Sequence, residues 1–219
     1  MTLSRPTAAF RHFVLRVQAV VALALGLFAA PAMARTLHVV ALGDSYTSGF
    51  GLPDGQGFTD VLSRALKAKG WDVEVANAGV PGETTEDGLA RYDSSVPAGT
   101  DALLVELGAN DMVGGLPPER AETALAEILE RAEKAHLAIL LLGMRATPDL
   151  GAEYQRKFDP IYPELAARYG VALYPFFLDG VAGDPKLRQP DGDHPNRSGV
   201  EVIVARVLSA VETLLRQVR

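Results

Sequence analysis

The chain has 219 residues, of which 48% are hydrophobic and 22% charged, and its formal net charge is −6. This composition is typical of a globular protein with one sizeable core, and it excludes disordered and fibrous classes. Because the sequence contains no cysteine, it also excludes disulfides, thiolate metal sites and a thiol nucleophile, so any nucleophile is an oxygen or an amine.

Residues 1–34 have the pattern of a signal peptide. Arg5, Arg11 and Arg16 precede an apolar run over 17–30, and Ala32-Met33-Ala34 offers a small-x-small cleavage site. As a helix the run would span roughly 21 Å, short of the roughly 30 Å of a bilayer core, which favours a signal peptide over a membrane anchor. We predict cleavage before Arg35, a single domain over 35–219, and a periplasmic or secreted location.

Removal of the signal peptide takes away three arginines and changes the formal net charge from −6 to −9. An acidic body disfavours nucleic acid and anionic membrane surfaces as partners. We therefore expect a soluble, exported enzyme or binding protein that does not stay inserted in a membrane, and we expect it to be a monomer.

Strands and helices alternate along the rest of the chain. Short apolar runs predict five strands, over 36–42, 73–76, 102–107, 139–142 and 171–174. Apolar residues at helical spacing predict helices over 58–66, 121–132, 154–169 and 200–215, with Pro160 and Pro163 indicating a kink or restart in the third and Asn196 as the N-cap of the last. This order predicts a three-layer α/β/α fold with a five-stranded, mostly parallel sheet.

In such sheets, ligands bind at the carboxyl ends of the strands. Gly43-Asp44-Ser45 follows the first predicted strand, where the glycine allows a sharp turn and leaves Ser45 at the head of the next segment. A Gly-Asp-Ser turn alone is more often a helix cap than a nucleophile. The sequence lacks the second glycine of the Gly-x-Ser-x-Gly elbow, and it lacks a nucleotide-binding glycine motif or Walker lysine.

Two further loops offer hydrogen-bond donors. Gly79 follows the second predicted strand and can present a bare backbone N–H, although a tight turn is the ordinary reading of this loop. Asn110 follows the third strand, and its neutral carboxamide can donate to developing negative charge, whereas Asp111 is interpreted as structural.

Asp191 and His194 precede the last predicted helix. Their spacing allows the carboxylate to accept the Nδ1 proton of the imidazole, as in the orienting half of a catalytic triad, and Asp191 is favoured over Asp193. A solvated acidic loop or a weak metal site is the alternative, but transition-metal sites usually require more nitrogen or sulfur ligands. We expect neither a metal nor an organic cofactor.

These motifs occur in the order seen in one family. Gly43-Asp44-Ser45, Gly79, Gly108-x-Asn110-Asp111 and Asp191-x-x-His194-Pro195 resemble the first, second, third and fifth blocks of the SGNH branch of the GDSL hydrolases. Within that family the chain is most similar to the exported bacterial group called thioesterase I, lysophospholipase or arylesterase, over residues 36–215. Tyr46 departs from the aliphatic residue often found after the nucleophile.

The resemblance implies a flavodoxin-like α/β/α fold and a serine hydrolase. It implies Ser45 as nucleophile, Asp191 and His194 as the rest of the triad, and Ser45 N–H, Gly79 N–H and the Asn110 side chain as the oxyanion hole. The implied activity is hydrolysis of carboxylic esters, and of thioesters, of acyl or aryl substrates such as lysophospholipids, through an acyl-enzyme intermediate. The partner is then a small-molecule or lipid ester.

Substrate identity is less defined than the chemistry. Apolar residues after the motifs, among them Phe50, Leu52 and Met112 and the loop 144–154, predict a groove for an apolar acyl or aryl group. A carbohydrate O-acetylesterase is an alternative within the same chemistry. A non-catalytic binding module and a metal-dependent hydrolase are alternatives from other classes.

Overall fold

Five parallel strands form a sheet in the computed structural model, which describes residues 35–218. The strands are β1 (Leu37–Gly43), β2 (Val73–Gly79), β3 (Ala102–Glu106), β4 (Ala138–Leu142) and β5 (Ala172–Tyr174). Their order across the sheet is β2-β1-β3-β4-β5, and every adjacent pair is parallel. The predicted five-stranded parallel sheet is confirmed, while the predicted signal peptide lies outside the described residues.

The central strands are buried and the edge strand β2 is not. All five residues of β3 are buried, because helices cover both of its faces. β2 extends three residues beyond its predicted end at Ala76, through Asn77 to Gly79. An edge strand has one free side and tolerates polar residues, so an apolar run alone underestimates its length.

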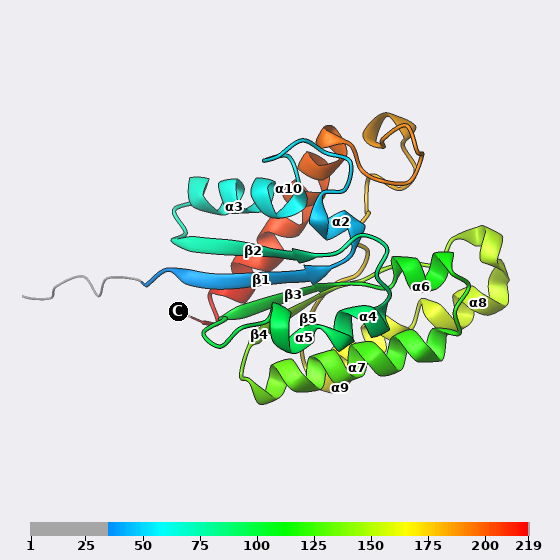
Figure 1. The fold of residues 1–219 in the computed structure, drawn as a ribbon, viewed down its shortest axis with the longest axis horizontal. Helices are drawn as coiled ribbons and strands as arrows, with labels where there is room; N and C mark the ends of the chain where they lie inside the picture. Colours follow the sequence, from blue (N-terminus) through cyan, green and yellow to red (C-terminus); the bar gives the residue numbers. More distant parts are fainter. Residues whose placement is uncertain (1–34, 219) are drawn as a thin grey trace, which may run out of the picture. The chain divides into compact units, whose positions relative to one another are not determined.

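Helices cover both faces of the sheet, which completes the three predicted layers (Figure 1). The helices α3 (Phe58–Ala68) and α10 (Arg197–Leu215) lie on one face. The other face carries α4 (Thr85–Ala90), α5 (Tyr92–Ser95), α7 (Pro118–Lys134) and α9 (Ile161–Tyr169). The buried residues of α7 recur every three or four positions, as expected of a helix with one apolar stripe: Pro118, Ala121, Ala124, Leu125, Ile128, Leu129 and Ala132.

Two predicted features of the later helices are confirmed, although α8 and α10 each begin three residues before the predicted start. The expected interruption near Pro160 separates α8 (Gly151–Phe158) from α9, and Pro160 is the N-cap of the second helix. Asn196 caps α10 as predicted, since its side-chain oxygen accepts from the backbone N–H of Gly199 at 3.1 Å.

Short helices follow two of the strands where the sequence predicted only turns. α2 (Ser45–Ser48) begins just after β1, and α6 (Ala109–Val113) begins just after β3. Four or five residues are too few to show helical periodicity, which is why the pattern did not reveal them. Both helices lie at the carboxyl ends of the strands, which point to the same side (Figure 1). Single-turn 3₁₀ helices occupy Pro148–Leu150 and Pro185–Leu187.

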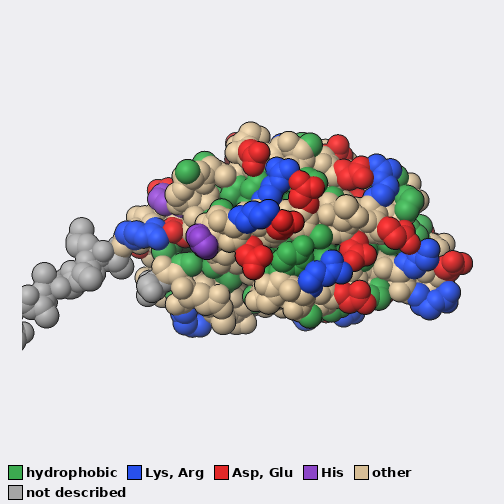
Figure 2. Space-filling model, turned by 90° about the horizontal axis from the view of Figure 1, so that it is seen from below, with side chains coloured by type: hydrophobic (Ala, Val, Ile, Leu, Met, Phe, Trp, Pro, Cys, Tyr) green, Lys and Arg blue, Asp and Glu red, His purple; other side chains and the backbone are tan. Residues whose placement is uncertain are grey.

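The surface on the α7 side of the sheet carries acidic and basic side chains next to one another (Figure 2). Such mixing produces no extended field of one sign over that face. Within residues 35–218, no helix combines the length and the apolarity needed to cross a membrane.

Candidate active site

Ser45 is the first residue of α2, immediately after the end of β1. Asp44 caps this helix, and its carboxylate accepts from the backbone N–H of Tyr46 at 3.0 Å. A side chain at Gly43 would place its Cβ 2.1 Å from Oγ1 of Thr47, so only glycine allows the chain to turn here. The Gly-Asp-Ser motif is therefore a compact strand-to-helix turn that fixes the position of the serine.

A pocket of about 330 Å³ gathers three of the predicted site residues. Ser45, Asn110 and His194 line it, although they are far apart in the sequence and come from the segments after β1, after β3 and before α10. The complete lining is Ser45, Tyr46, Phe50, Pro81, Gly82, Ala109, Asn110, Val113, Asp193 and His194. The structure thus brings together the hydroxyl, the imidazole and the carboxamide that the motifs singled out.

Asp191 and His194 are in direct contact. Nδ1 of His194 lies 2.8 Å from Oδ2 of Asp191, and the backbone N–H of His194 also donates to Asp191, at 3.1 Å. The backbone N–H of Asp193 and the imidazole of His194 hold the pKa of Asp191 below its usual value, so it stays a carboxylate at neutral pH. No hydrogen bond joins the side chains of Ser45 and His194 among the described residues, and such bonds often tighten only when substrate binds.

The two other predicted oxyanion donors have partners in this structure. Nδ2 of Asn110 donates to Oδ2 of Asp44 at 3.2 Å and to the backbone oxygen of Glu83 at 2.8 Å. The N–H of Gly79 donates to Oδ1 of Asn77 at 2.9 Å, and Gly79 is absent from the pocket lining. A Cβ at Gly79 would lie 2.4 Å from the backbone nitrogen of Ser48, so close packing of β2 against α2 also requires glycine here.

A pair of buried carboxyl groups next to Ser45 and α2 was missed by the sequence reasoning. Asp44 and Glu106 are both fully buried, and Glu106 accepts from the hydroxyl of Thr47 at 2.7 Å. Burial raises the pKa of Asp44 to about 7, and it raises the pKa of Glu106 well above its usual value. Since Asp44 accepts from both Tyr46 N–H and Asn110, it connects α2 to the carboxamide of Asn110.

Asp111 has the structural role expected of it. Its two oxygens accept from the backbone N–H of Thr85 at 2.8 Å and from the hydroxyl of Thr85 at 2.6 Å. These bonds tie α6 to the start of α4 and thereby hold Asn110 on the pocket side of the loop.

The apolar surface of the pocket differs partly from the expected groove. Phe50 lines it as predicted, and Val113, which the sequence did not single out, lines it as well. Met112 and Met144 instead belong to the hydrophobic core. Phe50 and Val113 are 49% and 74% exposed, so the pocket has an open apolar rim that a ligand could cover.

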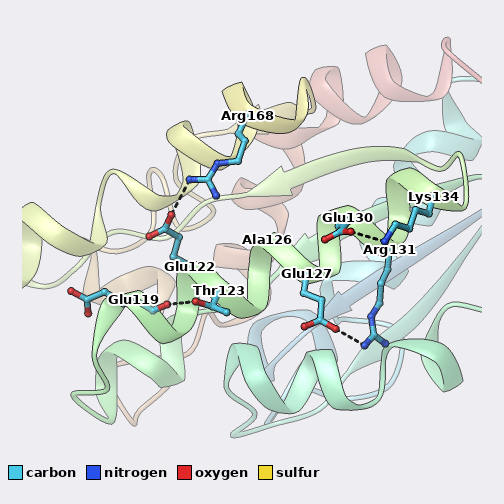
Figure 3. Close-up of a pocket in the computed structure, with 9 residues that line it drawn as sticks. All are labelled: Glu119, Glu122, Thr123, Ala126, Glu127, Glu130, Arg131, Lys134 and Arg168. Carbon is cyan, nitrogen blue, oxygen red and sulfur yellow. Dashed lines mark hydrogen bonds and ion pairs between the residues drawn. The ribbon is translucent and has the colours of Figure 1, made fainter.

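Larger grooves lie elsewhere but lack this chemistry. One of about 570 Å³ runs along α7, and three ion pairs lie within it: Glu122 with Arg168, Glu127 with Arg131, and Glu130 with Lys134 (Figure 3). Another, of about 620 Å³, lies at the amino end of the sheet, around Tyr92 and Val96 to Thr100. Within residues 35–218, no group of three or more His, Cys, Asp or Glu side chains is arranged to hold a metal ion.

A three-layer α/β/α fold with a serine after β1 and an Asp-His pair before the last helix defines a class of serine hydrolases. The chain belongs to the GDSL-like lipase/acylhydrolase family, whose model matches residues 41–202. It is therefore an SGNH-type enzyme that hydrolyses ester bonds.

Particular relatives extend the likeness over most of the chain. It is 37% identical to "Esterase TesA" of Pseudomonas aeruginosa, over 88% of this chain and 96% of that protein. It is 34% identical to "Thioesterase 1/protease 1/lysophospholipase L1" of Escherichia coli K12, over 81% and 84%. Among solved structures, the SGNH-hydrolase family esterase AlinE4 is 43% identical, with a TM-score of 0.71 over 84% of this chain and 99% of that one.

Proposed function

We propose that this protein cleaves carboxylic esters by two-step acyl transfer, with Ser45 as nucleophile, His194 as general base and acid, and Asp191 as the group that orients His194. The observation that carries this proposal is the convergence of Ser45 and His194 on one pocket, with Asp191 2.8 Å from the imidazole. A hydroxyl, an imidazole and an ionised carboxylate in this relation are the parts of a catalytic triad.

In the first step, Nε2 of His194 takes the proton of Ser45 as the serine oxygen attacks the ester carbonyl. Asp191 accepts from Nδ1 and stabilises the imidazolium that forms. The tetrahedral intermediate then collapses, His194 gives the proton to the leaving alcohol or thiol, and the acyl group stays on Ser45. Water attacks the acyl-enzyme with the same assistance and releases the carboxylic acid.

The oxyanion of each intermediate requires donors within about 3 Å. We assign this role to the Ser45 N–H, the Gly79 N–H and the Asn110 carboxamide. Asn110 lines the pocket, and its present acceptors are a buried carboxyl of raised pKa and one backbone oxygen. A full negative charge on the substrate oxygen is a stronger acceptor than a carboxyl whose raised pKa keeps it partly protonated at neutral pH, so Asn110 is expected to turn toward it.

The acyl side of the site suits apolar groups. Val113 offers exposed apolar surface at the pocket rim, and Pro81, Gly82 and Ala109 add uncharged wall. Phe50 adds apolar surface beside His194, with ring centroids 4.9 Å apart. The names of relatives, which include an arylesterase and a thioesterase/lysophospholipase, support acyl and aryl substrates. We therefore propose aryl esters and esters of apolar acyl groups as the substrate class.

Covalent labelling tests the proposal. A 4-nitrophenyl alkylphosphonate should add one phosphonyl group to the wild-type protein, located on Ser45 by peptide mass spectrometry. Ser45→Ala should remain unlabelled, keep its circular dichroism spectrum and lose about a thousandfold or more of its rate on 4-nitrophenyl butyrate. Labelling of the Ala variant, or retention of its activity, would remove Ser45 from the mechanism.

We also propose export, with residues 1–34 as a cleaved signal peptide and 35–219 as the hydrolase domain. The basic segment, the apolar run and the Ala32-Met33-Ala34 site support this. Expression of the full chain in a Gram-negative host should yield periplasmic protein whose N-terminal sequence starts at Arg35. Retention of Met1 in the periplasmic protein would contradict cleavage.

A further inference from the structure

Asp193 gives the pocket a fixed negative charge. Among the ten residues that line the pocket, Asp193 is the one with a carboxylate side chain, and the lining contains neither lysine nor arginine. Among the described residues, no lysine or arginine lies within ion-pair distance of Asp193, whereas exposed acids such as Glu122 and Glu127 pair with an arginine. A charged group entering the pocket therefore meets a carboxylate without an ion-pair partner, since the nearby guanidinium of Arg188 donates to the backbone oxygen of Gly192 instead.

Tyr46 fixes the position of this carboxylate. Its hydroxyl donates to Oδ1 of Asp193 at 2.9 Å, which links the residue after the nucleophile to the residue before the catalytic imidazole. Burial and the charge of Asp193 raise the pKa of Tyr46, so the phenol stays protonated and continues to donate. The ring of Tyr46 also packs against His194, with centroids 5.5 Å apart. An exposed aspartate would otherwise be free to turn into solvent.

The carboxylate lies on the leaving-group side of the site. His194 must reach the leaving oxygen or sulfur to protonate it, and Asp193 precedes His194 in the chain and lines the same pocket, so we assign the leaving group to the side next to Asp193. The remaining wall, from Pro81, Gly82, Ala109 and Val113, carries no charge and suits the acyl group. The two halves of an ester substrate thus meet surfaces of different electrostatic character.

We propose that Asp193, held in place by Tyr46, makes this enzyme select esters whose leaving group is neutral or cationic over esters whose leaving group is anionic. This inference rests on the proposed function and narrows its substrate class. Like-charge repulsion disfavours an alcohol or thiol that carries phosphate or carboxylate near the reacting oxygen. The selected substrates are aryl and alkyl esters of uncharged or cationic alcohols, while lysophospholipids and phosphate-bearing thioesters are disfavoured.

A matched pair of substrates tests the selection. Both are butyrate esters of a para-substituted phenol, one with a methyl carboxylate ester at the para position and one with a free carboxylate. The quantity measured is the ratio of kcat/KM for the anionic ester to that for the neutral ester, at an ionic strength of about 0.01 M, where charges are weakly screened. Comparing this ratio between variants removes the intrinsic difference in reactivity of the two phenols.

Asp193→Asn should raise the ratio about threefold to tenfold, as expected for one exposed charge a few ångströms away. Asp193→Lys should raise it further, and Tyr46→Phe should raise it by less because the carboxylate remains but is no longer held. Glu133→Gln is the matched control, because Glu133 is an exposed acid near the end of α7, at the opposite end of the sheet. Its ratio should equal that of the wild type.

Salt dependence provides a second measurement that requires no variant. Raising the ionic strength from about 0.01 M to about 1 M should increase the wild-type ratio and leave that of Asp193→Asn nearly constant. If both esters are hydrolysed but the kcat/KM ratio is the same in Asp193→Asn as in the wild type and does not change in high salt, the proposed selection by Asp193 is wrong. The proposed ester hydrolysis would then still stand. An enzyme that hydrolyses neither ester and takes up no phosphonate contradicts both.

Discussion

Charged side chains are used differently in the α7 groove and in the pocket at the carboxyl ends of the strands. In the groove, each acid of the three ion pairs drawn in Figure 3 has a basic partner within ion-pair distance. At and around the pocket, Asp191 pairs with an imidazole, Asp193 with a phenol, and Asp44 with a carboxamide. The comparison teaches that a carboxylate can act on a ligand or on the imidazole where the fold places no lysine or arginine in contact with it.

The largest expected effect comes from the acid that orients the imidazole. Asp191→Asn should lower kcat about a thousandfold or more, because an amide at this position favours the wrong tautomer of His194. The rate on 4-nitrophenyl butyrate measures this. Asp193→Asn is the matched control in the same loop and should lose far less. Equal losses in the two variants would mean that the sequence-based preference for Asp191 is wrong.

A smaller loss is expected for the carboxamide. Asn110→Ala removes one oxyanion donor and should lower kcat about a hundredfold, or about 3 kcal/mol in the barrier, with a modest change in KM. Steady-state kinetics at saturating ester separate the two constants. A rise in KM without a fall in kcat would assign Asn110 to substrate binding and not to the transition state.

The buried carboxyl pair should control how stability depends on pH. The pKa of Asp44 is raised to about 7 and that of Glu106 is also raised, so the folded state holds protons that the unfolded chain releases. The stabilisation is therefore complete at pH values below about 4 and is lost as pH rises through the raised pKa values.

Glu106→Gln should consequently lose less stability than the wild type between pH 5 and pH 8. Urea unfolding at the two pH values measures this difference. Glu133→Gln, which alters an exposed acid, should reproduce the pH dependence of the wild type. If the Glu106→Gln variant also kept the pH dependence of the wild type, Glu106 would not contribute to it.

The smallest effects are expected in the α7 groove. Glu122→Ala breaks the ion pair with Arg168, in which both side chains are substantially exposed. The free energy of unfolding should fall by less than about 1 kcal/mol, and kcat should not change. A clear loss of activity in this variant would place the groove in the function of the enzyme and contradict the distinction drawn above.

The sequence was most informative where function and structure are local. Asp191 and His194 are three residues apart, so their contact followed from the length of a turn. The N-cap at Asn196 and the break near Pro160 also depend on neighbouring residues, and both were predicted. Short helices such as α6 and the extension of β2 to Gly79 were missed because neither produces a long apolar period.

Contacts between distant segments were decided by the tertiary structure. Tyr46 and Asp193 lie 147 residues apart, and their hydrogen bond depends on where the loop before α10 passes over α2. The burial of Asp44 and Glu106 likewise depends on β1 and β3 being neighbours in register, with Gly43 opposite Glu106. Periodicity and motif spacing describe the chain one segment at a time. Strand order and register, which set the distances and charges around Ser45, arise only when the whole sheet packs.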